Sequence, residues 1–180
     1  DLKAGGREDS HFGLADIHVE PITLSWHWSQ ADLAVGYAFW APTGDYDKSH
    51  PGLPGKGFWT HMFTAGGTYY LDAEKTWAVS ALNRYEIAME HQDVPITPGN
   101  TDTLEWGLSK SLTKTIDLGL VGFYQQQTTD DSGPGSSRAL DYSVAIGPEV
   151  SLFCPKLGLF TSLRYLREVA VNDRREGNVA

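Results

Sequence analysis

Histidine and serine side chains are the first candidates for chemistry in this sequence. A nucleophilic mechanism needs a hydroxyl or thiol beside a base, and the most suggestive combination is Ser80 with His61 on neighbouring predicted strands. None of the six histidines has the H-x-x-x-H spacing of a helix-borne zinc site, and no Gly-x-Ser-x-Gly motif occurs. The single cysteine, Cys154, is interpreted as a packing residue. We therefore predict that the chain is not an enzyme and uses no metal and no cofactor.

A second set of reactive side chains consists of charged residues that interrupt apolar stretches at alternate positions. The members of this set are Arg84, Glu86, Glu105, Asp117, Glu149, Arg164 and Glu168. If the apolar positions beside them contact lipid, these charges point to the interior, because a charge facing hydrocarbon costs roughly 2–4 kcal/mol at the midplane. They would then either form a salt-bridged plug or line an aqueous path that selects solutes. Glu149 and Arg164 are expected side by side, because a short turn joins their strands.

The elements that position these charges are predicted to be β-strands, because apolar and polar residues alternate and helical periodicity is almost absent. The clearest window is 142–154, in which Val144 and Ile146 share one face while Ser143 and Ala145 share the other. The pattern predicts about eight strands, near 22–28, 33–41, 58–71, 77–89, 101–112, 116–129, 142–154 and 157–169.

The connections between the predicted strands alternate strictly between short and long. Short ones fall near 29–32, 72–76, 113–115 and 155–156. Long ones, which hold six of the nine prolines, fall near 42–57, 91–100, 130–141 and 170–177. This asymmetry is typical of outer-membrane barrels, with short periplasmic turns and long extracellular loops.

Strand length and aromatic placement favour the same fold. A strand of 12 residues spans about 40 Å, and at a tilt of ~45° it covers roughly 28 Å of the bilayer normal. Aromatic residues cluster near strand ends, as in the interfacial girdles of membrane barrels. Lys110 falls on an apolar face near a turn, where it can extend to the interface. No stretch of 18 apolar residues exists, so a transmembrane helix is excluded.

The predicted fold is therefore an all-β, antiparallel transmembrane β-barrel with about eight visible strands. A soluble β-barrel with its polar face outside explains the alternation equally well, but it explains the strand length and the loop asymmetry less well. The sequence starts at Asp1 and ends at 177–180, where a new strand begins. We expect residues 1–180 to be a single barrel domain that is incomplete at both ends. The net charge of 14 − 23 = −9 excludes nucleic acid as a partner.

Several short motifs add a resemblance to a known family. They are Ala41-Pro42-Thr43-Gly44-Asp45-Tyr46, Gly55-Lys56-Gly57-Phe58-Trp59-Thr60-His61, Thr68-Tyr69-Tyr70-Leu71-Asp72, Ala145-Ile146-Gly147-Pro148-Glu149 and Ser162-Leu163-Arg164-Tyr165. This set resembles the family named for the meta-pathway of phenol degradation, which is described as outer-membrane channels. The resemblance implies a place in the bacterial outer membrane and passive uptake of small aromatic or hydrophobic compounds.

The loop motifs also have an interpretation that needs no ligand. Pro42 and Gly44 end a strand, and Gly55 and Gly57 let the backbone return to the sheet. The residues considered as parts of a gate are Pro42, Gly44, Asp45, Tyr46, Gly55 and Gly57. They serve either as a gate or as loop architecture alone.

Three functional hypotheses follow from the sequence. The first is a passive channel whose partners are the lipid bilayer and small solutes. The second is a structural or adhesive outer-membrane barrel that conducts nothing. The third is a soluble barrel that binds a ligand in its interior. The sequence leaves the substrate and the oligomeric state open.

Overall fold

The computed structural model describes residues 2–4, 7–9, 13–47, 53–172 and 178–179. The regular structure in these residues is entirely β, as the alternation predicts. No helix suited to crossing a membrane occurs in the described part of the chain.

One antiparallel sheet contains all strands except an N-terminal hairpin of β1 (Leu2–Ala4) and β2 (Arg7–Asp9). The strands of the large sheet are β3 (Ile17–His27), β4 (Ala31–Ala41), β5 (Thr60–Tyr70), β6 (Trp77–Ala88), β7 (Thr101–Ser111), β8 (Ile116–Gln127), β9 (Tyr142–Cys154), β10 (Leu159–Arg164), β11 (Leu166–Asn172) and β12 (Asn178–Val179). From β3 to β9 each strand pairs with the next one along the chain, and both β10 and β11 pair with β9.

Strands β10 and β11 are two parts of one long strand. Arg164 lies opposite Glu149 and Arg167 lies opposite Ile146, so the register continues across Tyr165 between them. Tyr165 N donates to the Pro148 carbonyl at 3.1 Å, but Pro148 has no N–H to return the second bond of this pair. The missing donor explains the interruption. The sheet therefore has eight long strands, as predicted from the sequence.

The predicted strand ranges are confirmed with small shifts, and the largest difference lies in β3. The strand starts at Ile17 rather than at residue 22. A bulge between Val19 and Ile22 contains Pro21 and shifts the register. The alternation of apolar and polar residues is therefore broken at this point. The sequence pattern alone misses residues 17–21, the part of the strand before the bulge ends.

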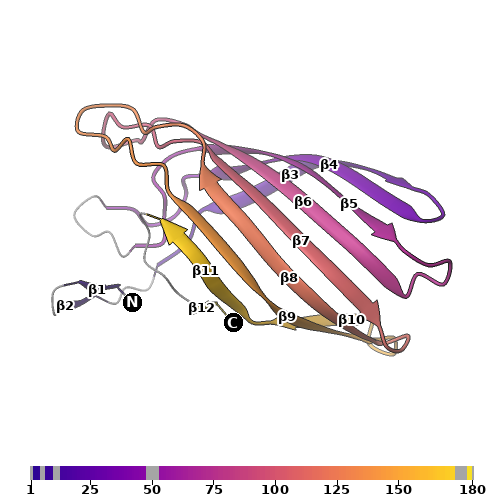
Figure 1. Cartoon of the computed structure of the whole chain (residues 1–180). Helices are drawn as coiled ribbons and strands as arrows, with labels where there is room; N and C mark the ends of the chain where they lie inside the picture. Colours follow the sequence, from indigo (N-terminus) through magenta and orange to yellow (C-terminus); the bar gives the residue numbers. More distant parts are fainter. Residues whose placement is uncertain (1, 5–6, 10–12, 48–52, 173–177, 180) are drawn as a thin grey trace.

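The connections separate by length onto the two ends of the sheet (Figure 1). Short connections 28–30, 71–76, 112–115 and 155–158 lie at one end, and long connections 42–59, 89–100 and 128–141 lie at the other. The predicted alternation of short and long is thus confirmed for these segments. Residues 48–52 of the first long loop, and 173–177 of the predicted connection 170–177, lie outside the described residues.

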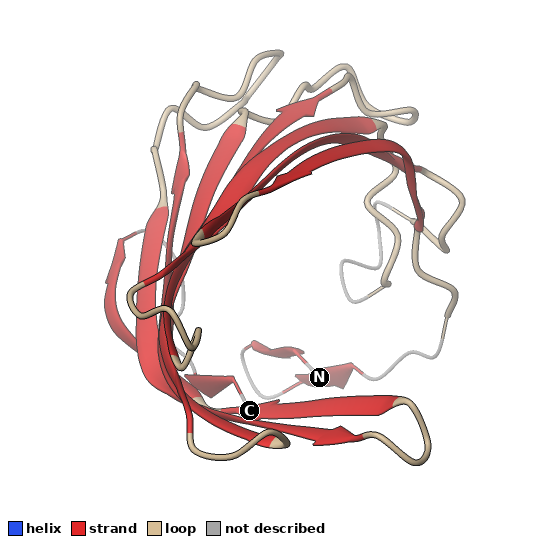
Figure 2. Ribbon diagram, turned by 90° about the vertical axis from the view of Figure 1, so that its right-hand side faces the viewer, coloured by secondary structure: helices blue, strands red, loops and turns tan. Residues whose placement is uncertain are grey.

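The sheet curves through most of a ring, with β3 on one edge and β10, β11 and the two-residue β12 on the other (Figure 2). Within the described residues these two edges do not pair with each other. The buried residues are mainly small ones on the concave face, such as Ala38, Ser143 and Ala145. Large apolar side chains are exposed instead on the convex face, among them Leu24, Leu104, Leu118, Leu120, Leu152 and Leu163.

Candidate functional site

The concave face of the sheet surrounds a cavity of about 820 Å³. Small and polar residues contribute much of its lining, including Ser25, Ala34, Thr68, Ser80 and Ser151. The period of two along a strand sends these residues to one face and the large apolar residues to the other. The cavity is therefore the consequence of the same alternation that predicts the strands.

All seven charged residues predicted to point inward lie on the concave face. Glu105, Asp117, Glu149 and Arg164 line the large cavity. Glu86 lines a second, smaller cavity near the long loops. Arg84 contacts Glu105 and Glu168 contacts Ser143, so both also lie on the concave face. The orientation predicted from the sequence agrees with the structure, and the role in transport stays a prediction.

In the described residues, two arginine–carboxylate ion pairs join neighbouring strands along the concave wall. Arg164 on β10 contacts Glu149 on β9 through Nη2–Oε2 at 2.6 Å and Nε–Oε2 at 2.7 Å. Arg84 on β6 contacts Glu105 on β7. The expectation that Glu149 and Arg164 lie side by side is confirmed. Both pairs follow the wall between adjacent strands, because their strands are hydrogen-bonded neighbours.

Glu168 makes a third polar contact along this wall. Its carboxylate accepts a hydrogen bond from the Ser143 hydroxyl on β9 at 2.7 Å. Ser143 is only 1% exposed, so the bond satisfies a hydroxyl that water reaches poorly. This carboxylate therefore helps to attach the last long strand to β9.

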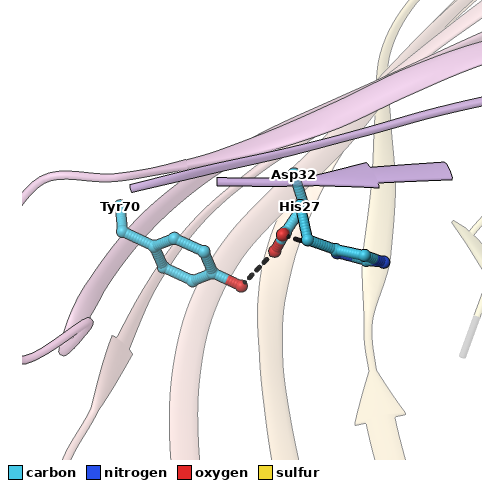
Figure 3. Close-up of polar contacts among 3 residues, drawn as sticks. All are labelled: His27, Asp32 and Tyr70. Atoms are coloured by element: carbon cyan, nitrogen blue, oxygen red, sulfur yellow. Dashed lines mark hydrogen bonds and ion pairs between the residues drawn. The ribbon is translucent and has the colours of Figure 1, made fainter. Parts of the chain in front are cut away.

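A cluster of His27, Asp32 and Tyr70 near the short-turn end was not predicted from the sequence (Figure 3). His27 Nδ1 and Asp32 Oδ1 are 2.8 Å apart, and the Tyr70 hydroxyl donates to Asp32 Oδ2 at 2.7 Å. His27 and Asp32 also line the large cavity. Asp32 falls in a segment predicted as a turn. It lies two residues before Ala34, and continuing the alternation would have placed both on the inner face.

Ser80 and His61 do not form a nucleophile and base. Ser80 lies on the concave face, where its hydroxyl is 2.8 Å from that of Thr68. His61 lies on the opposite face of the neighbouring strand, where Nδ1 is 2.7 Å from the Tyr37 hydroxyl. Because Ser80 pairs in register with Thr68 and His61 pairs with Ile87, their side chains emerge on opposite sides of the sheet. The suggested pairing of these two residues is therefore wrong.

The first long loop is fastened at its base by Asp16, which precedes β3. The Asp16 carboxylate accepts hydrogen bonds from Gly44 N at 2.9 Å and from Lys56 N at 3.0 Å. Asp45 adds two contacts with Leu14, one through its backbone N–H at 2.9 Å and one through its carboxylate at 3.0 Å. These bonds hold the two ends of the loop together and attach them to the segment before the sheet.

The same loop packs on the second long loop through aromatic rings. The His91 ring lies 4.5 Å from the Tyr46 ring and 5.2 Å from the Phe58 ring. Gly57 O accepts from Gln92 N at 3.0 Å, and Gly57 adopts a φ of 74°, which favours glycine. The gate candidates Tyr46 and Gly57 thus belong to a docked pair of loops.

Two more gate candidates lie at the base of this loop. A Cβ on Gly55 would approach the Asp45 carbonyl oxygen to 2.7 Å, so the close approach of the two ends requires glycine there. Pro42 follows directly after the last residue of β4. These positions agree with the interpretation as loop architecture, and a gating role stays a prediction.

The short turn 71–76 contains a carboxylate with a shifted pKa. The Thr76 hydroxyl, which donates to Asp72 Oδ2 at 2.6 Å, lowers the pKa of the Asp72 carboxyl, and the Trp77 N–H at 2.8 Å adds to the effect. Lys110 reaches the same turn, because its Nζ lies 3.0 Å from Thr76 Oγ1 and 4.8 Å from the Trp77 ring centroid. The predicted position of Lys110 at the end of the apolar face is confirmed.

Comparison with known proteins gives one match. No curated protein and no solved structure matches the chain. The model of the family described as "Putative MetA-pathway of phenol degradation" matches residues 1–180. The motifs that carry the resemblance include two that the structure brings together, since Glu149 of one lies opposite Arg164 of the other. The chain belongs to this phenol-degradation family.

Proposed function

We propose that this chain forms the wall of a bacterial outer-membrane channel through which small solutes, including aromatic or hydrophobic compounds, diffuse passively. The observation that carries the proposal is the distribution of side chains on the two faces of the sheet. Apolar residues of the long strands are exposed on the convex face, whereas the cavity on the concave face combines charged and small polar residues with a few larger apolar ones, such as Leu82 and Phe123.

The convex face is apolar over several adjacent strands. Leu104 and Leu108 on β7 are 40% and 38% exposed, and Leu118 and Leu120 on β8 are 43% and 44% exposed. Leu108 lies directly opposite Leu120 in the register, so these side chains form a continuous surface. A contiguous apolar surface of this kind requires a covering partner in water. Acyl chains are the covering partner that an antiparallel sheet with a polar interior implies.

The dimensions support a membrane location. The long strands from β3 to β9 contain 11 to 13 residues, and 11 residues tilted ~45° cover roughly 25 Å of the bilayer normal, which is the height of a barrel's apolar band. Aromatic residues lie on the convex face in the half toward the long loops, where Tyr37 pairs with Phe63 and Phe63 pairs with Tyr85. Trp77 lies at the short-turn end. A soluble barrel would place its large apolar residues on the concave face instead.

The concave wall favours an aqueous path over a plug. The two arginines are each paired with a carboxylate on a neighbouring strand, so their ion pairs lie along the wall. A cavity of about 820 Å³ remains in front of them. Hydrated charges beside such a space are the arrangement that channels use to pass polar and small solutes. The compounds themselves are assigned from the family's description, which concerns phenol degradation.

A non-conducting barrel that presents its loops is the alternative, and the docking of Tyr46 and Phe58 on His91 is the observation that favours it. Such a barrel would have the same convex face. Measurements of ionic current across a bilayer separate the two functions directly, because only a channel lets ions pass.

The test is conductance of the protein, refolded in detergent and inserted into planar lipid bilayers, with and without phenol. Discrete current steps that phenol blocks or alters support a channel with a path for aromatic compounds. Protein that inserts but stays silent favours the structural alternative. Protein that is monodisperse without detergent contradicts both membrane functions.

A further inference from the structure

The basic residues on the concave wall of strands β3–β11 are neutralised by their immediate neighbours. Arg164 forms its ion pair with Glu149 at 2.6 Å, and Arg84 pairs with Glu105. Each guanidinium therefore has little charge left to attract an anion in the cavity, because the pair acts at a distance as a dipole. Among the described residues, Arg84 and Arg164 are the two arginines that the strands place on this wall.

Three more carboxylates on the same wall form no hydrogen bond or ion pair with an arginine or lysine among the described residues. Asp32 shares its carboxylate between His27 and the Tyr70 hydroxyl. Among the described residues, neither Glu86 nor Asp117 has a hydrogen-bond or ion-pair partner. Glu86 lines the smaller cavity near the long loops, whereas Asp117 lines the large cavity near the short turns. Unbalanced negative charge is thus present at both ends of the wall.

In the described segments, two lysines lie near carboxylates of this wall. Lys75, whose Nζ lies 4.4 Å from the centroid of the Tyr70 ring, interacts electrostatically with Asp32. Lys56 lines the smaller cavity together with Glu86. Its Nζ lies 5.1 Å from the centroid of the Trp40 ring, a position that holds the ammonium by a cation–π contact. Asp117 and Asp32 lie at the opposite end of the strands from Lys56. Their distance from its ammonium therefore exceeds the screening length of about 10 Å at 0.1 M salt.

We propose that Glu86 and Asp117 make this channel selective for neutral and positively charged small solutes over small organic and inorganic anions. The inference rests on the proposed channel function and adds the class of solute that the path accepts. A fixed carboxylate about 10 Å from a passing ion in water-like dielectric changes the local concentration of a monovalent ion roughly two-fold, in opposite directions for cations and anions. Each carboxylate therefore raises the cation-to-anion permeability ratio about two- to four-fold at low salt.

The experiment measures the reversal potential of the full chain in planar bilayers under a KCl gradient. We expect a preference for K⁺ over Cl⁻ that declines as the total salt concentration rises, because salt screens fixed charges. Glu86→Gln and Asp117→Asn each reduce the permeability ratio about two- to four-fold, and the double substitution reduces it by the product. Two variants at separate positions keep the test valid if one of them fails to fold.

The matched control is Asp102→Asn, which removes a carboxylate from the convex face of the same sheet, where Asp102 accepts from the Asn83 amide at 2.7 Å. This substitution leaves the ratio unchanged if the wall charges set the selectivity. Current steps without cation preference, or an equal change in the control, overturn the selectivity and leave the channel function standing. Inserted protein without any current overturns the channel function and the selectivity together.

Discussion

Gly147 occupies the tightest position in the sheet, and its substitution by alanine gives a prediction with a definite magnitude. The residue lies on β9 beside Tyr165, where the missing N–H of Pro148 interrupts the ladder between β10 and β11. A Cβ at Gly147 would be 2.8 Å from the Tyr165 carbonyl carbon and 3.2 Å from Leu166 Cα, and it would overlap the Tyr165 carbonyl oxygen. Real Cβ atoms essentially never come within 3.0 Å of another heavy atom. The last long strand must therefore move away from β9.

The cost of Gly147→Ala follows from these contacts. Inserting a methyl group into a packed position costs about 1–3 kcal/mol. The hydrogen bond from Tyr165 N to Pro148 O, at 3.1 Å, is lengthened by the same movement, and its loss adds roughly 1 kcal/mol. Replacing glycine in a strand otherwise gains about 0.5–1 kcal/mol. We expect a net loss of about 1–3.5 kcal/mol in the free energy of unfolding.

Gly119→Ala provides the matched control. Gly119 lies on β8 and also lines the concave face, but a Cβ there would have its nearest neighbour, Leu108 O, at 3.5 Å, an ordinary contact. The assay is urea unfolding of the refolded protein in detergent micelles, followed by tryptophan fluorescence. If the two variants unfold within about 0.5 kcal/mol of each other, the reasoning about the tight position is refuted.

Three further predictions concern single polar contacts. The pKa of Asp72 is lowered below its usual 3.8 by the Thr76 hydroxyl, so its stabilising contribution is complete above that value and is lost as the pH falls through the lower, folded-state pKa. Thr76→Val makes the melting temperature less sensitive to pH in this acidic range. Asp16→Ala removes the acceptor for two backbone N–H groups of the first long loop, and limited proteolysis then cuts that loop several-fold faster because its base opens. A double-mutant cycle on Glu149 and Arg164 gives a coupling of about 0.5–1 kcal/mol, since the guanidinium side chain is 49% exposed.

Each of these three experiments has its own control. Asp72→Asn has the same effect as Thr76→Val on the pH dependence, because it removes the titrating group; a steep dependence that survives Asp72→Asn contradicts the assignment. Asp130→Ala, in the third long loop, leaves cleavage of the first loop unchanged. A coupling near zero between Glu149 and Arg164 at low salt means that their contact does not contribute to the stability of the sheet.

The fold was predictable from the sequence wherever the alternation is unbroken. In β9 most alternate positions from Tyr142 to Leu152 are large and apolar, so the faces taken by Ser143 and Val144 follow from the period of two. In β3 the bulge at Pro21 shifts this period, and the pattern does not show where the strand starts. The interruption at Tyr165 depends on a proline in the neighbouring strand, so it is visible only when the pairing of β9 and β10 is known.

The sequence predicted which face of the sheet each charged residue of the candidate site takes, but it predicted only some of the contacts between them. Alternation places Arg84 and Glu105 on one face, and a short turn places Glu149 opposite Arg164. The contact of Tyr70 with Asp32 joins the ends of two strands, and its register is set by a turn that the hydrophobic pattern does not define. Ser80 and His61 lie on adjacent strands, but the register pairs Ser80 with Thr68 and His61 with Ile87, so their side chains take opposite faces.

We propose that the convex face contacts lipid and the concave face contacts water, and labelling along β8 tests this most directly. In a Cys154→Ser background, single cysteines replace Leu118, Gly119, Leu120 and Val121 in protein inserted into liposomes. Gly119 and Val121 line the cavity, whereas Leu118 and Leu120 are exposed on the convex face. We expect a membrane-impermeant maleimide to label positions 119 and 121 much faster than 118 and 120, and a fluorophore at 118 or 120 to be quenched by brominated lipid. Equal labelling at all four positions, or quenching at 119 and 121, would contradict these assignments.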